Sequence, residues 1–238
     1  MQLIFPKDYI DYNTAMHWFE QIKNFNNRQS RLDEEKIFVL EHNNVYTAGK
    51  SINNYPNETH IQQIHNTPVV YTNRGGLWTW HGIGQVVVYF IYNLHARRLF
   101  ISDFMDTIES ITVKNIVFEL EKLTGKQLTQ TNLAVYADGN KRGFWVKNTA
   151  TLNIAKIGFM GLRVSNGFVY HGISINYNND LTFFDYINPC GLGDVKITSI
   201  KETAGIENIN KQLDINNFKH HLGNSLFNAL ETLHGKNK

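Results

Sequence analysis

Apolar residues recur along this chain with the spacing of helices at both ends and in the middle. After Pro6, they return every three or four positions, which predicts a first helix capped by Asp8. The same spacing predicts a helix over 102–123, ended by Gly125, and a last helix from Asp214 onward. The face of the first predicted helix carries Tyr9, Tyr12, Met16, Phe19 and Ile22.

Short runs rich in β-branched and aromatic residues lie between these helices and are typical of strands. The longest, QVVVYFIYN at 85–93, predicts a central strand. Because strands follow one another after residue 130, the order favours an α+β fold with mixed or antiparallel sheets over repeated βαβ units. We expect one domain over 1–238, with roughly the last 50 residues as an alternative smaller subdomain. The other predicted strands are 36–41, 68–72, 133–136, 143–146, 152–157, 161–164 and 168–175.

Composition narrows the function classes. The chain has 238 residues, a net charge of +2 and one cysteine, which excludes an internal disulfide and a cysteine-rich zinc site. A weak positive charge without a basic stripe argues against a nucleic-acid binder. The ten histidines lack metal-ligand spacing, so we expect no metal. The start lacks a signal-peptide pattern, and no apolar run approaches the ~20 residues of a spanning helix, so we expect a soluble cytoplasmic protein.

The segment RGGLWTWHGIGQ, at 74–85, is the first candidate for chemistry. Its glycines permit close approach of the backbone to a ligand, and the freed N–H groups can hold an oxyanion, a carbonyl or a phosphate. A plain strand connection needs glycines for its turns as well. No Gly-Lys-Ser/Thr follows, and the next element is a predicted strand, so the segment is neither a phosphate-binding P-loop nor a dinucleotide fingerprint.

Three single residues are further candidates. Cys190 lies between Pro189 and Gly191, a turn-like setting in which a thiol is more reachable than in a core strand. Lys156 lies in a largely apolar strand, where it either faces solvent or points inward toward an active site. His171 is a strand histidine, a type more often structural than catalytic.

Four segments, in this order along the chain, resemble the octanoyltransferases of protein lipoylation. They are EHNNVYTAGKS (41–51), RGGLWTWHGIGQ (74–85), AKIGFMGLRVSNGFVYHGISIN (155–176) and INPCGLGDVKITSI (187–200). The resemblance implies the fold of biotin and lipoate ligases, an α+β fold with a larger mixed sheet flanked by helices and a smaller sheet. It also implies transfer of an octanoyl group, without a cofactor, from octanoyl-acyl carrier protein to a lysine of lipoyl domains. The implied acceptors are the E2 subunits of 2-oxoacid dehydrogenases and the glycine cleavage H protein.

The resemblance also implies roles for individual residues. The acyl-thioester cysteine of the family matches Cys190, and its partner lysine matches Lys156. In the implied reaction the Cys190 thiolate takes the acyl group, while Lys156 protonates the leaving pantetheine thiol and then accepts a proton from the acceptor amine. Arg74 either fixes the loop or meets an acidic group. The implied substrate-binding residues are Arg74, Gly75, Gly76, Leu77, Trp78, Thr79, Trp80, His81, Phe159, Met160, Gly161, Gly172, Ile173 and Ser174.

Some positions depart from the family pattern. Bulky Trp78, Trp80 and Phe159 stand where smaller or different residues are usual, and Ile83 replaces a common proline. We expect the three bulky residues to shorten or reshape the acyl tunnel, which affects chain-length preference more than reaction type.

Three other functions compete with octanoyl transfer. An ATP-dependent lipoate or biotin ligase shares the fold, but the GRGRRG-type loop of biotin ligases is absent. A cysteine hydrolase would pair Cys190 with His171 or His81. In a non-catalytic protein that binds lipoyl domains, Cys190 would be structural.

Overall fold

The computed structural model describes residues 1–26, 35–55, 59–139, 142–189, 195–206 and 214–235, and two sheets organise this part of the chain. The larger sheet is mixed: the pairs β1–β2 and β10–β12 are parallel, and its other strand pairs are antiparallel. Strand β12 (Lys196–Ile197) pairs with β10 outside the main path of strands. The expected mixed sheet is therefore confirmed. The main path runs β1 (Gln2–Ile4), β2 (Lys36–Leu40), β7 (Gln85–Asn93), β11 (Phe168–Asn176), β10 (Ile154–Ser165), β9 (Gly143–Asn148), β8 (Leu133–Ala137).

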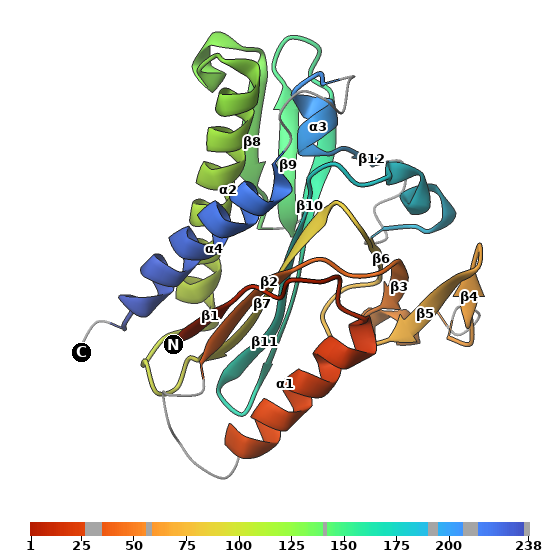
Figure 1. The fold of residues 1–238 in the computed structure, drawn as a ribbon, viewed down its shortest axis with the longest axis vertical. Coiled ribbons are helices and arrows are strands. Elements are labelled where there is room, and N and C mark those ends of the chain that lie inside the picture. The colour runs from red at the N-terminus through yellow and green to blue at the C-terminus, as the bar shows by residue number, and fades with distance from the viewer. Residues whose placement is uncertain (27–34, 56–58, 140–141, 190–194, 207–213, 236–238) are drawn as a thin grey trace.

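The smaller sheet has the order β4 (Gln63–Ile64), β5 (Thr67–Tyr71), β3 (Val45–Ala48), β6 (Trp78–His81). Figure 1 shows it on the side of the larger sheet that carries α1, while α2 and α4 cover the other side. Among the described helices, none is long and apolar enough to cross a lipid bilayer. The helices are α1 (Tyr12–Asn26), η2 (Lys50–Asn54), α2 (Ile101–Thr124), η4 (Leu128–Gln130), η5 (Leu181–Tyr186), α3 (Ile200–Thr203) and α4 (Ile215–Glu231).

Strand β7 is buried along its whole length because both of its faces are covered. Val86, Val88 and Phe90 pack toward α2 and α4, while Val87 and Tyr89 pack toward α1. A strand covered on both faces needs apolar residues at successive positions, which explains the unbroken run seen in the sequence.

The structure corrects two details of the expected elements. Helix α1 begins at Tyr12, and the carboxylate of Asp11, not Asp8, accepts hydrogen bonds from the first turn, 2.9 Å from the Asn13 amide. Just before the helix, Ile10 is held by a parallel bridge to His42. The two strands expected over 152–164 are one continuous β10. Helix α4, together with α2, contributes to the core beneath the larger sheet.

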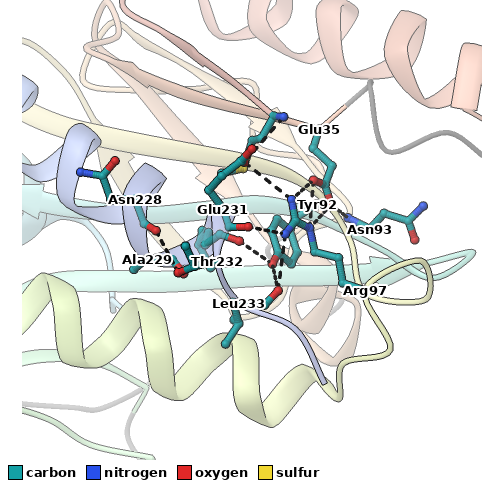
Figure 2. A network of polar contacts seen from close by, with 11 residues as sticks. Glu35, Tyr92, Asn93, Arg97, Asn228, Ala229, Glu231, Thr232 and Leu233 are labelled. Atoms are coloured by element: carbon teal, nitrogen blue, oxygen red, sulfur yellow. Dashed lines mark hydrogen bonds and ion pairs between the residues drawn. The ribbon is translucent and has the colours of Figure 1, made fainter. Parts of the chain in front are cut away.

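A buried polar network fastens the end of α4 to this sheet (Figure 2). The Arg97 guanidinium donates to the fully buried Glu35 carboxylate, with its shortest bond at 2.7 Å, and to the backbone carbonyl of Glu231 at 2.9 Å. Glu35 also accepts from the Asn93 amide at the end of β7. Since each buried charge has its partner, the network fixes three chain segments against one another.

Candidate active site

The glycine loop of residues 74–77 connects β5 to β6, and Arg74 holds it from within. Its buried guanidinium donates to the carbonyl oxygens of Gly75 at 2.9 Å and Leu77 at 2.8 Å. It also reaches the neighbouring strand β3, where it donates to the carbonyl and hydroxyl oxygens of Thr47 at 2.7 and 2.9 Å. Of the two roles left open for Arg74, these bonds support fixing the loop.

Backbone amides that follow β3 also donate hydrogen bonds to the carbonyls of the loop. Those of Arg74, Gly76 and Leu77 accept hydrogen bonds from the amides of residues 50, 51 and 49, at 2.9 to 3.2 Å. Within the described residues, the N–H groups of Gly75 and Gly76 donate to no protein acceptor. The loop thus offers backbone donors to a ligand, as oxyanion-binding sites do.

A small cavity of about 40 Å³ lies where this loop meets β10 and β11. Strand pairing explains why segments distant in sequence meet here, since Phe159 pairs with Ser174, and Gly161 pairs with Gly172. A side chain at Gly172 would run into the backbone of β7, so the close strand approach requires glycine. The expected binding residues that line the cavity are Arg74, Gly75, Gly76, Trp78, Thr79, His81, Phe159, Met160, Gly161, Gly172, Ile173 and Ser174.

Two of the expected binding residues do not line this cavity. The carbonyl oxygen of Leu77 instead accepts a hydrogen bond from the Arg74 guanidinium. Trp80 stacks on Phe183, with ring centroids 4.7 Å apart, in the core of the smaller sheet. Of the three bulky departures from the family pattern, Trp78 and Phe159 therefore border the cavity and Trp80 only supports its wall.

Lys156 points inward and is fully buried, which decides between its two expected orientations. Its ammonium nitrogen donates to the carbonyl of Arg142 at 2.8 Å. It also lies over the rings of Trp145 and Phe159, 4.7 and 5.2 Å from their centroids. Phe159 also lines the cavity, whereas Lys156 is not among its lining residues, so the Phe159 ring connects the amine to the candidate binding space.

Cys190 lies outside the described residues, but the chain on each side of its segment is placed. Pro189 forms a parallel bridge with Trp78 of the cavity wall. After residues 190–194, β12 pairs with β10, where Ile197 is the partner of Lys156. The chain therefore enters this segment beside the cavity wall and leaves it beside Lys156.

Two buried histidines, His81 and His171, also line the cavity, and burial lowers the pKa of each. The pKa of His81 is well below 6.5, and its Nδ1 lies 2.7 Å from the side-chain oxygen of Gln85. Burial, with the charges of Arg74 and Arg163 adding to it, lowers the pKa of His171 to about 3. Near neutral pH, both rings are thus uncharged.

Two buried polar atoms on the cavity wall have no hydrogen-bond partner among the described residues. They are the Thr79 hydroxyl and Nδ1 of His171, whose Nε2 is engaged by the Asn73 side chain at 2.7 Å. Such atoms can bind a polar group of a ligand or a water molecule. Three wall residues were not predicted: Tyr12, Val87 and Tyr89. In the sequence, these three residues belong only to an apolar helix face or an apolar strand run, and both patterns mark core positions equally well.

Comparisons with known proteins agree with this geometry. Residues 11–227 match the family of the lipoyl protein ligase A/B catalytic domain. An octanoyltransferase of Buchnera aphidicola subsp. Schizaphis graminum is 33% identical over 198 residues, which cover 82% of this chain and 79% of the relative. A lipoate-protein ligase A solved with ATP has a TM-score of 0.55 at 11% identity, covering 100% of this chain and 89% of the other. A bipartite lipoate protein ligase from Thermoplasma acidophilum, described with its E2 lipoyl domain, has a TM-score of 0.54 at 9% identity, with 99% and 85% covered.

Proposed function

The chain belongs to the lipoyl protein ligase A/B catalytic domain family and within it to the octanoyltransferases, and we propose a donor, an acceptor and a covalent route for its acyl transfer. The donor is octanoyl-acyl carrier protein, and the acceptor is a lysine of a lipoyl domain. The acyl group passes through a thioester on Cys190. One domain over 1–238 performs both steps.

The observation that carries this proposal is the position of Lys156. Its buried amine lies 5.2 Å from the ring centroid of Phe159, which lines the cavity, and Lys156 lies on the strand that pairs with β12, just after the segment of Cys190. A buried amine beside a binding cavity is placed for proton transfer rather than for solubility.

Both steps balance with these two side chains. First, the Cys190 thiolate attacks the thioester carbonyl, a new C–S bond forms, and the pantetheine thiolate leaves with a proton from the Lys156 ammonium. Second, the acceptor amine attacks the Cys190 thioester, an amide bond forms as the acyl C–S bond breaks, the Cys190 thiolate is released, and Lys156 takes the proton of the attacking amine. The N–H groups of Gly75 and Gly76 are the candidate donors for the oxyanion of each tetrahedral intermediate.

Intact mass spectrometry tests the covalent step. Wild type mixed with octanoyl-acyl carrier protein should gain one octanoyl group that hydroxylamine removes, and Cys190→Ala and Cys190→Ser should gain none. Transfer to a lipoyl domain should proceed without ATP, which separates the reaction from that of a ligase. A Cys190→Ala variant that still transfers octanoate would eliminate the thioester route.

The role of Lys156 needs a separate measurement. Positioned acid–base groups typically contribute ~10²- to 10⁴-fold in rate, so Lys156→Met should slow transfer by that order. Alkylation of Cys190 against pH then shows whether the lysine activates the thiol. An unchanged pH profile in Lys156→Met would mean that it does not. Release of free octanoate without an acceptor, at the full rate, would identify a hydrolase instead.

A further inference from the structure

Two buried side-chain amides connect His81 of the cavity lining to the strand that carries Lys156. Gln85 of β7 and Asn176 of β11 are fully buried, and Nε2 of Gln85 donates to Oδ1 of Asn176 at 2.9 Å. At one end, Nδ1 of His81 lies 2.7 Å from Oε1 of Gln85. At the other end, Nδ2 of Asn176 donates to the Thr198 carbonyl at 3.0 Å, and the Thr198 amide donates to the Lys156 carbonyl at 2.9 Å.

Two backbone carbonyls fix the direction of the side-chain hydrogen bonds in this network. A carbonyl oxygen only accepts, so the Gln85 atom that faces the Trp80 carbonyl at 3.2 Å must be the amide nitrogen. The same holds for the Asn176 atom that faces the Thr198 carbonyl. The Gln85 oxygen therefore faces His81, and Nδ1 of that ring carries the proton. Because the neutral ring has one proton, Nε2 is a bare acceptor.

The bare nitrogen is the polar atom that His81 leaves for a ligand. His81 lines the cavity and Gln85 does not, so the Nδ1 edge of the ring is turned away from the cavity. In the part of the chain that the structure describes, Gln85 is the only hydrogen-bond partner of the ring. The cavity thus holds one hydrogen-bond acceptor beside the amides of Gly75 and Gly76, which are donors.

The reacting thioester offers this acceptor nothing to bind. Its carbonyl oxygen only accepts hydrogen bonds and suits the amides of Gly75 and Gly76, and its alkyl chain has no polar hydrogen. Donors reach the reacting carbon with the acceptor lysine, whose attacking nitrogen carries N–H bonds. The lone pair on Nε2 of His81 is therefore suited to the nucleophile of the second step, and it repels the carbonyl oxygen.

Resting on the acyl transfer proposed above, we propose that Gln85, supported by Asn176, is a positioning residue that holds His81 as the hydrogen-bond acceptor for the attacking amine of the lipoyl domain. Nε2 of His81 orients this nitrogen in the second step. The ring does not take the proton of the amine, because burial keeps the pKa of His81 well below 6.5.

Two variants separate the acceptor from its support. His81→Asn keeps an amide N–H for the Gln85 oxygen but removes Nε2. Gln85→Met keeps the length of the side chain but removes the oxygen that binds Nδ1. The matched control is Tyr92→Phe, which removes a buried 2.9 Å hydrogen bond to the Leu230 carbonyl, outside both this network and the cavity lining.

Single-turnover kinetics measure the two steps apart: octanoyl transfer to Cys190, and transfer from the isolated acyl-enzyme to a lipoyl domain. Both variants should slow the second step roughly tenfold or more and leave the first within about threefold, and the control should stay within about threefold in both. An unchanged second step in His81→Asn would overturn the proposal. Equal slowing of both steps would also overturn it, because Nε2 would then act on the thiol or on the pantetheine amide.

Nuclear magnetic resonance gives a readout that a purely structural role would not change. Two-bond proton–nitrogen correlations of the histidine rings, assigned by the signals that His81→Asn loses, show which nitrogen carries the proton. Wild type should hold it on Nδ1, and a folded Gln85→Met should lose this preference. A proton on Nε2 in wild type, or an unchanged pattern in Gln85→Met, would refute the role of Gln85.

The same spectra test the amine contact without turnover. A lipoyl domain should shift the Nε2 resonance of His81, and a domain whose acceptor lysine is replaced by methionine should not. Equal spectra with both domains would overturn the contact. If wild type forms no acyl-enzyme, the proposed thioester route fails, and the spectra still decide whether His81 accepts from the amine.

Discussion

Gly143, at the start of β9, offers the sharpest test of how the amine of Lys156 is positioned. Its φ of 137° lies in a region that residues with side chains rarely adopt. A Cβ built there would lie 2.6 Å from the carbonyl oxygen of Gly158, 2.8 Å from Cε of Lys156 and 3.1 Å from its Nζ. The absence of a side chain thus makes room for the lysine where β10 bulges between Lys156 and Gly158.

Gly143→Ala therefore has two expected effects of different kinds. The strained backbone should lower the free energy of unfolding by about 1–3 kcal/mol. The methyl group also displaces Nζ of Lys156 from its 2.8 Å bond with the Arg142 carbonyl. Since a displacement of ~1 Å in a catalytic group can cost ~10²-fold, a shift of a few tenths of an ångström should slow transfer roughly 10-fold or more.

The assay is single-turnover octanoyl transfer, run beside urea denaturation of each variant. Gly139→Ala, in the same β8–β9 connection, is the matched control, because a Cβ there meets no atom within 4 Å and should change neither quantity. A folded Gly143→Ala enzyme that transfers at the wild-type rate would refute the reasoning. So would a rate loss that merely follows the unfolded fraction, because the effect would then be one of stability alone.

Two further predictions concern the frame around the cavity. Arg74→Lys cannot reproduce the donors to Gly75, Leu77 and Thr47, so it should lower the free energy of unfolding by about 2–4 kcal/mol in urea titrations and raise KM for the acyl donor. Burial lowers the pKa of His42 from 6.5 to about 4, so protons favour the unfolded chain between these values and stability is lost as pH falls through them. The free energy of unfolding should therefore fall by about 2 kcal/mol between pH 7 and pH 5. In His42→Gln, the dependence of the free energy of unfolding on pH should be weaker by that amount.

Most of the strands could be predicted from the local sequence, because a run of apolar residues can be recognised without information about distant contacts. The boundaries of β7 match the expectation, whereas β10 was divided at Gly158, which is part of a bulge rather than a strand end. The start of α1 depended on a long-range bridge between Ile10 and His42, which no local pattern contains. For the same reason Tyr12 looked like an ordinary core residue, although it lines the cavity.

Arg74 shows how one residue links the shape of the site to its charge. Its guanidinium occupies the loop carbonyls and so leaves the amides of Gly75 and Gly76 for a ligand. The same positive charge adds to the effect of burial in lowering the pKa of His81 and His171. The lining of the cavity thus includes both the glycine segment with its backbone donors and two uncharged rings, a combination suited to an acyl carbonyl with an alkyl tail. Because Arg74 contributes to both properties, a substitution that removes its charge should weaken donor binding and also raise the pKa of both histidines, although burial still keeps them low.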